Sequence, residues 1–345
     1  MRQSTGALLR QLPYEFKRRV GHAHFPSMPV ESLLGRTIAK YARRMPDADL
    51  FLYSGSALQA FCGPSRGRRF LFQYHPSPKF IEATLSEIDD LAELRAWEDE
   101  AEVSNTAMEA HHRAEVALAD YFVVASSFTK NGLLELGVDE RRVAVVPYGC
   151  PPVNTAPVPP PVRNEFLFVG QGVKRKGLHL LIEAWRRAEL DGMRLRVVAS
   201  RMDPEIADFA KDLSSVEITP RVSRQELGEL MASADTFVMP SLVEGFGLVF
   251  GEALAQGCRL IGSSNTGVVD YRLDSRIGTV VPAGSLDALT RALQEAAASM
   301  DPKRPYWHDA IAAARERSWD SFRAGIVQSV SDLARPGSAV EGRDE

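Results

Sequence analysis

The sequence is poor in cysteine and shows no metal-binding pattern. Its three cysteines, Cys62, Cys150 and Cys258, lie far apart, and none belongs to a Cys-x-x-Cys pair. This disfavours both a disulfide-stabilised scaffold and a structural zinc site, and it fits a reducing compartment. The paired histidines lack carboxylate or cysteine partners at ligand spacing, so we expect no metal ion and no other cofactor.

Long apolar runs are also lacking. No segment approaches the roughly 18 apolar residues of a membrane-spanning helix, and the first residues, MRQSTGALLRQLPYEF, lack the apolar core of a signal peptide. We therefore expect a cytoplasmic protein. The composition, with 45% hydrophobic and 25% charged residues, is that of a folded protein. At about 150 residues per domain, the chain is long enough for two domains.

Charge is distributed unevenly, although the net charge is only −4. Residues 1–44 contain nine lysines or arginines and two acids, whereas residues 81–120 contain twelve acids and two arginines. Two interpretations of the basic segment stay open. It contacts an anionic membrane surface or acceptor lipid, where each cation contributes about 1 kcal/mol, or it is a solvated helix face balanced by the acidic segment. We expect no nucleic-acid partner.

Short apolar runs alternate with helical patterns in both halves of the chain. In the first half we expect four strands, over residues 49–53, 69–73, 121–125 and 143–147. The helices expected there are a long charged one and a shorter one, over about 79–118 and over 128–136. The second half shows five strand patterns, over 166–169, 195–199, 216–218, 236–239 and 259–262. Four of its helices are expected to begin near Gly177, Pro204, Ser223 and Gly247. Three further helices are expected over about residues 286–298, 305–317 and 321–333.

This alternation predicts parallel sheets with helices on both faces. Seven prolines from Pro147 to Pro161 predict an extended linker between the halves. We therefore predict an α/β fold with two doubly wound, Rossmann-like domains that face a cleft. The predicted N-terminal α/β domain covers residues 1–150, and the linker covers residues 151–163. The predicted C-terminal domain covers residues 164–318. A predicted C-terminal helix over 319–334 packs back on the first domain, and a disordered tail covers 335–345.

The strongest motif is PSLVEGFGLVFGEALAQG, residues 240–257. A predicted strand ends at Pro240, and the following loop leads into a helix that places Glu252 eight residues after Glu244. Both carboxylates can then face one cleft, where they favour hydroxyl-rich ligands. The structural alternative is an acidic residue that stabilises the helix dipole, together with a surface glutamate.

The same loop is suited to binding anions. Gly245 and Gly247 let a ligand approach the backbone closely. The amides of Phe246, Gly247 and Leu248 lie at a helix N-terminus, where they suit phosphate or sugar oxygens.

A second motif, GVKRKG, places three cations between two glycines where a helix is predicted to begin. This arrangement suits a polyanion, although it lacks the spacing of a triphosphate-binding P-loop. A fixed cation such as Lys176 can stabilise the charge that develops on a departing diphosphate. The structural alternative is a basic turn at the start of a surface helix.

The segment EGFGLVFGEALAQG resembles the signature of retaining nucleotide-sugar glycosyltransferases of the GT-B fold, specifically glycosyltransferase family 4. Three further segments resemble the same family: residues 119–150, residues 166–185, and SRQELGELMASADTFVMPS followed by SSNTGVVDY. The resemblance covers about residues 119–320 and fades towards the N-terminus.

The resemblance implies a role for each residue of these motifs. Glu252 would accept hydrogen bonds from the ribose hydroxyls of a nucleoside diphosphate sugar. Glu244, with the amides of residues 246–248, would hold the transferred sugar and the distal phosphate. Lys176, with Arg175 beside it, would neutralise the diphosphate.

The remaining expected donor contacts are Gly170, Gln171 and the backbone near Val222, which would meet the base. Gln171 departs from the family, which usually has arginine there, so the phosphate charge must be met by the GVKRKG cations. The family usually reads Pro-Asn-Gly where this chain has Tyr148 between Pro and Gly. The first half also opens with a basic helical segment in place of a strand and glycine-rich loop, so we expect an N-terminal domain that is reduced or incomplete.

His75 follows a predicted strand in the segment QYHPSPK. It resembles loosely the histidine that many family members place near the donor sugar, and its pKa range suits proton transfer. A lone histidine is more often structural than catalytic. We keep His75 with Glu244 and Lys176 as the candidate catalytic residues.

The resemblance thus predicts a metal-independent glycosyltransferase that moves a sugar from a nucleotide sugar to a glycan or lipid-linked acceptor with retention of configuration. The C-terminal domain would bind the donor and the N-terminal domain the acceptor, in the synthesis of a polysaccharide or glycolipid. The cytoplasmic protein would then be peripheral on the inner membrane face. The alternatives are a non-catalytic nucleotide-sugar-binding protein or partner subunit, and a GT-B nucleotide-sugar epimerase.

Overall fold

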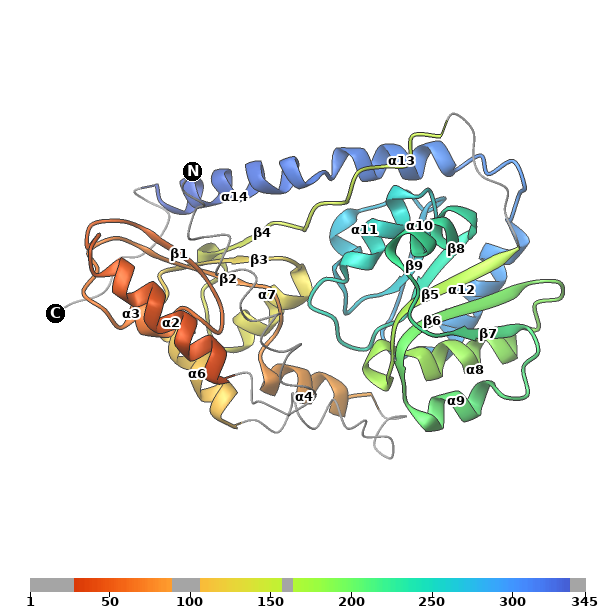
Figure 1. The fold of residues 1–345 in the computed structure, drawn as a ribbon, viewed down its shortest axis with the longest axis horizontal. Helices are drawn as coiled ribbons and strands as arrows, with labels where there is room; N and C mark the ends of the chain where they lie inside the picture. The colour runs from red at the N-terminus through yellow and green to blue at the C-terminus, as the bar shows by residue number, and fades with distance from the viewer. Residues whose placement is uncertain (1–27, 89–105, 157–163, 336–345) are drawn as a thin grey trace. The chain divides into compact units, whose positions relative to one another are not determined.

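The protein folds into two compact units. The computed structural model describes three stretches of the chain, residues 28–88, 106–156 and 164–335 (Figure 1). Unit 1 consists of residues 1–72 and 107–121, and unit 2 consists of residues 73–106 and 122–345. The N-terminal part of the basic segment, part of the linker and the predicted tail lie outside the described residues.

Unit 1 contains two parallel strands, β1 (Leu50–Tyr53) and β2 (Arg69–Gln73), which confirm two predicted strands. Its helices are α2 (Met28–Ala42), α3 (Leu58–Phe61) and α6 (Thr106–Leu118). Glu115 of α6 is fully buried and accepts hydrogen bonds from the amides of Gly55 and Ala57, both at 2.7 Å. This carboxylate therefore holds the start of α3 against α6.

The single long helix predicted over residues 79–118 is wrong. Helix α4 (Pro78–Ser86) ends inside that range, and the described helix α6 covers Thr106–Leu118. The apolar side chains of α4 pack with Phe128 and Val243, and Leu85 is the last of them. Because packing of an apolar face stabilises most protein helices, α4 ends close to its last packed side chain, with its C-cap at Glu87.

Unit 2 begins its sheet structure with β3 (Tyr121–Val124) and β4 (Val143–Val145), which pair in parallel. Between them lie α7 (Ser127–Glu135) and the 3-10 turn η2 (Glu140–Arg142). Ser126 caps α7, because its hydroxyl accepts a hydrogen bond from the amide of Thr129 at 3.1 Å.

The main sheet of unit 2 has six parallel strands in the order β10-β9-β8-β5-β6-β7. The strands are β5 (Glu165–Gly172), β6 (Arg194–Met202), β7 (Val216–Thr219), β8 (Thr236–Met239), β9 (Arg259–Ser263) and β10 (Gly278–Val281). Five were predicted. The sixth, β10, was missed because it is a short, partly exposed edge strand. The chain runs outwards from β5 in both directions, as in a doubly wound sheet.

Helices cover both sides of this sheet (Figure 1). They are α8 (Leu178–Ala188), α9 (Pro204–Ala210), α10 (Arg224–Ser233), α11 (Leu248–Ala255), α12 (Leu286–Ala298) and α13 (Trp307–Glu316). Helix α14 (Trp319–Leu333) instead packs on Val146 and Tyr148, which follow β4. Helix α8 contacts α9 and α12, whereas α11 contacts α10 and α13. In the described ranges, no helix has both the length and the apolar character needed to cross a bilayer.

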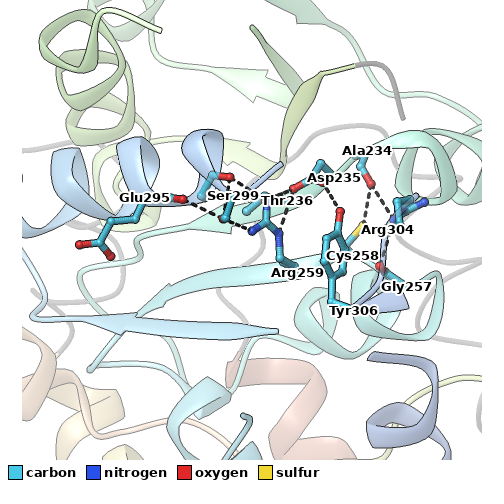
Figure 2. A network of polar contacts seen from close by, with 11 residues as sticks. Ala234, Asp235, Thr236, Gly257, Cys258, Arg259, Glu295, Ser299, Arg304 and Tyr306 are labelled. Atoms are coloured by element: carbon cyan, nitrogen blue, oxygen red, sulfur yellow. Dashed lines mark hydrogen bonds and ion pairs between the residues drawn. The ribbon is translucent and has the colours of Figure 1, made fainter. Parts of the chain in front are cut away.

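A buried polar network fixes the amino ends of β8 and β9 (Figure 2). Asp235 binds the Arg259 guanidinium and the Tyr306 hydroxyl. Arg304, fully buried, donates to the carbonyl oxygens of Ala234 at 3.0 Å and Gly257 at 2.9 Å. The network holds the start of α13 to the amino ends of these strands. Ligands bind at the opposite, carboxyl ends of the strands in such folds.

Candidate functional site

A cavity of about 950 Å³ lies within unit 2, at the carboxyl ends of β5, β6 and β8. All twelve predicted site residues line it: His75, Gly170, Gln171, Arg175, Lys176, Val222, Glu244, Gly245, Phe246, Gly247, Leu248 and Glu252. The structure therefore brings together residues that span most of unit 2 in the sequence. Their roles toward a ligand stay predictions.

The basic motif forms one wall of the cavity. Lys174–Lys176 make a 3-10 turn, η3, which ends at Gly177 with φ of +71°. A Cβ atom at Gly177 would collide with the carbonyl oxygen of Pro240, so glycine is needed for both its backbone angle and the close approach. The Leu242 amide donates to the Arg175 carbonyl oxygen at 2.8 Å. The turn is thereby held against the segment that follows β8.

An ion pair joins this turn to the loop at 244–247. The ammonium of Lys176 donates to the carboxylate of Glu244, and the two side chains are only 16% and 13% exposed. The Arg175 guanidinium lies alongside and donates to the Val243 carbonyl oxygen at 3.2 Å. Burial by itself would raise the pKa of Glu244, but attraction to Lys176 and Arg175 outweighs burial and lowers it. Glu244 is therefore ionised at neutral pH.

The loop itself is held from several sides. Gly245 contacts the Tyr74 backbone so closely that a Cβ atom would collide with it. The Gly245 carbonyl oxygen accepts hydrogen bonds from the hydroxyls of Ser126 at 2.5 Å and Thr129 at 3.2 Å. The Phe246 ring packs edge-on against Tyr148, with centroids 5.2 Å apart. These contacts fix the backbone in place before any ligand binds.

The loop leads directly into α11. Gly247, with φ of +86°, is the residue before the helix. The first amides of a helix have no acceptor within the helix, so those at 246–248 can serve an anion, as predicted. Glu252 lies one turn further along α11 and is partly buried. Burial raises the pKa of Glu252, and the charge of Arg224 opposes this increase.

His75 lies beside the loop at 244–247 and lines the same cavity. A Cβ atom at Gly245 would lie 3.1 Å from both the Cα and the ring Cδ2 of His75. The Gln73 side-chain amide donates to the His75 carbonyl oxygen at 3.0 Å, which fixes the backbone there. In the part of the chain that the structure describes, no group of three or more His, Cys, Asp or Glu residues could hold a metal ion.

The sequence analysis missed several residues of the cavity wall. Arg221 and Arg224 flank the predicted Val222, and Tyr74 and Tyr148 also line the cavity. The two arginines are next to a predicted contact in the sequence RVSR, so their basic character was a usable signal. Tyr148 was noticed only as a departure from the family's Pro-Asn-Gly, because its contact with Phe246 joins residues about a hundred positions apart.

Residues 163–299 match the model of a protein family described as glycosyl transferases group 1. The chain is 30% identical over 202 residues to D-inositol 3-phosphate glycosyltransferase of Kineococcus radiotolerans. This match covers 49% of this chain and 45% of that protein. It is 26% identical over 259 residues to alpha-maltose-1-phosphate synthase of Mycolicibacterium smegmatis. This second match covers 66% of this chain and 66% of that protein. The matches thus span less than two thirds of these curated relatives.

Among solved structures, sucrose-phosphate synthase from Thermosynechococcus elongatus is similar in fold. The TM-score is 0.64 at 18% identity, over 89% of this chain and 78% of that chain. The likeness supports the predicted GT-B fold of parallel sheets covered by helices.

The Lys176–Glu244 pair yields a prediction about stability. Lys176→Ala leaves a buried carboxylate without its main partner, so we expect the free energy of unfolding to fall by about 3 kcal/mol. The double variant Lys176→Met with Glu244→Gln removes both charges and should recover most of that loss. Urea unfolding of the wild type, both variants and the control Lys211→Ala, on an exposed pair with Asp208, measures this.

If Lys176→Ala costs no more than the Lys211→Ala control, or if the double variant is no better than the single one, then the pair does not hold the loop.

Proposed function

We propose, from the match of residues 163–299 to the glycosyl transferases group 1, that the protein moves a sugar from a nucleoside diphosphate sugar to an acceptor hydroxyl. The observation that carries the proposal is one cavity that combines a basic turn, a helix N-terminus and two carboxylates. A nucleotide sugar offers matching groups, because its diphosphate is anionic and its ribose and sugar hydroxyls are hydrogen-bond donors.

The predicted roles follow from the positions of these groups. Lys176 has three donor hydrogens, so it can bind a phosphate oxygen while it keeps its bond to Glu244. Glu244 then faces the transferred sugar. Glu252, one helical turn beyond the anion-binding amides, accepts from the ribose hydroxyls.

The proposed chemistry needs no metal ion. The bond between the anomeric carbon and the diphosphate oxygen breaks, the acceptor oxygen bonds to that carbon on the same face, and the departing phosphate takes the acceptor proton. This gives retention of configuration. Lys176 and Arg175 stabilise the charge on the leaving diphosphate, because they are held in place before the reaction. His75 lies next to Glu244 as a further candidate at the sugar.

The proposed acceptor is a glycan or a lipid-linked molecule bound by the N-terminal domain. The curated relative from Kineococcus radiotolerans is named for a phosphorylated polyol, so phosphate-bearing alcohols belong in the acceptor screen.

A membrane surface is the proposed site of action. Three apolar side chains are exposed on or just after α2, namely Leu34, Tyr41 and Met45. Basic residues on the same segment are exposed beside them: Arg36, Lys40, Arg43 and Arg44. Cations around exposed apolar and aromatic side chains suit an anionic lipid interface. A cytoplasmic protein held in this way would be peripheral on the inner face of the membrane.

The activity is tested by release of nucleoside diphosphate from a panel of nucleotide sugars in the presence of EDTA, with and without acceptors. We expect release that depends on the acceptor, and NMR should show that the product keeps the donor's anomeric configuration. Lys176→Ala should lower kcat by about 100-fold or more, since it removes a fixed charge at the leaving group. Glu252→Gln should mainly raise KM.

The matched control is Glu229→Gln, an exposed residue of α10 that does not line the cavity; it should keep full activity. Nucleotide binding without turnover would support a non-catalytic binder instead, and activity lost in EDTA would contradict the metal-free mechanism.

Membrane binding is measured by co-sedimentation with vesicles of phosphatidylcholine, alone or mixed with phosphatidylglycerol. We expect binding only to the anionic vesicles. Arg36→Ala with Lys40→Ala should weaken binding by about 30-fold, at about 1 kcal/mol per cation. Equal binding to neutral vesicles would show that the cations of α2 do not drive binding. An unaffected double variant, or no binding to either kind of vesicle, would show that α2 is a solvated helix.

A further inference from the structure

Two arginines, Arg221 and Arg224, flank Val222 in the cavity wall, and the proposed roles do not use their side chains. Arg221 follows β7, and Arg224 is the first residue of α10; both side chains are exposed. Among the residues that the structure describes, neither guanidinium forms a hydrogen bond or an ion pair within 4 Å. The inner cations differ, since Arg175 already binds the Val243 carbonyl oxygen and Lys176 binds Glu244. The donors of Arg221 and Arg224 are therefore available to a ligand.

The order of groups along the cavity places this arginine pair at the nucleoside end. A diphosphate on the amides at the start of α11 would have its ribose near Glu252, about 6 Å further along the helix axis. Arg224 is close enough to Glu252 to act on its charge. The base, which continues from the ribose away from the diphosphate, would then lie beside Arg221 and Arg224.

The walls at this end suit a flat base with acceptor atoms on its edge. Val198, Val222 and Leu227 are apolar and line the same cavity, so they can contact the faces of a ring. A guanidinium only donates hydrogen bonds, through a planar fork. Guanine presents two adjacent acceptors, N7 and O6, whereas adenine presents an acceptor beside a donor and a pyrimidine has no N7.

We propose, on the premise that the cavity binds a nucleoside diphosphate sugar, that Arg221 and Arg224 select guanine through N7 and O6, so that the donor is a GDP-sugar.

Isothermal titration calorimetry with five nucleotides tests the assignment at the level of single atoms. GDP should bind at least ten-fold more tightly than UDP or ADP, as a bidentate arginine contact discriminates among bases. Inosine diphosphate keeps N7 and O6 and should bind like GDP. The 7-deaza analogue of GDP lacks the N7 acceptor and should bind about ten-fold more weakly.

Variants connect the preference to the arginines. Arg221→Lys with Arg224→Lys keeps both charges but removes the planar forks, so the preference for GDP over UDP and over 7-deaza-GDP should shrink to about three-fold or less. Affinity for UDP should change little. The matched control is Arg276→Lys, an exposed arginine paired with Asp274 and Asp309 outside the cavity. It should leave every affinity unchanged.

The binding results that would contradict the proposal can be told apart. If UDP or ADP binds as tightly as GDP, or if the 7-deaza analogue binds like GDP, the guanine assignment is wrong while the nucleotide-sugar site stands. If the lysine variants keep the full preference for GDP, other groups select the base. If no nucleotide binds at all, both this inference and the proposed function fall.

Discussion

The ion pair between Lys176 and Glu244 is the interaction on which the candidate site depends. It joins a basic turn after β5 to the loop after β8, two segments about seventy residues apart. Both charges are largely buried, and a buried charge is tolerable only when it is paired. The close approach of Gly177 to Pro240, the contact of Gly245 with Tyr74 and the hydrogen bonds from α7 all hold this pair in one geometry. The cavity wall is thus preorganised by the fold.

The cavity is lined by two pairs of cations and by two carboxylates. Arg175 and Lys176 are engaged by protein oxygens and lie where a diphosphate would lose its sugar. Arg221 and Arg224 line the same cavity with exposed side chains. Burial acts to raise the pKa of both carboxylates, but the cations beside Glu244 lower its pKa overall, whereas the pKa of Glu252 stays raised. A ligand that carries both anionic and hydroxyl groups fits this combination of cations and carboxylates.

Much of the fold and site could be predicted because the signals are local. Glu244, the glycines after it and Glu252 lie within nine residues, so a loop followed by a helix was enough to bring them together. Strands of the second half were recognisable from short apolar runs between helices. The break after α4 depends on packing against Phe128 and Val243, and the position of Tyr148 depends on Phe246. Contacts of this kind join distant segments, and no spacing in one sequence reveals them.

The most direct test of the account is a crystal structure of the protein with the nucleoside diphosphate that binds most tightly. The account predicts phosphate oxygens within hydrogen-bonding distance of the Lys176 ammonium and of the amides at the start of α11, with both ribose hydroxyls on Glu252. A nucleotide bound elsewhere, or one in this cavity whose phosphates avoid Lys176 and the loop, would contradict it.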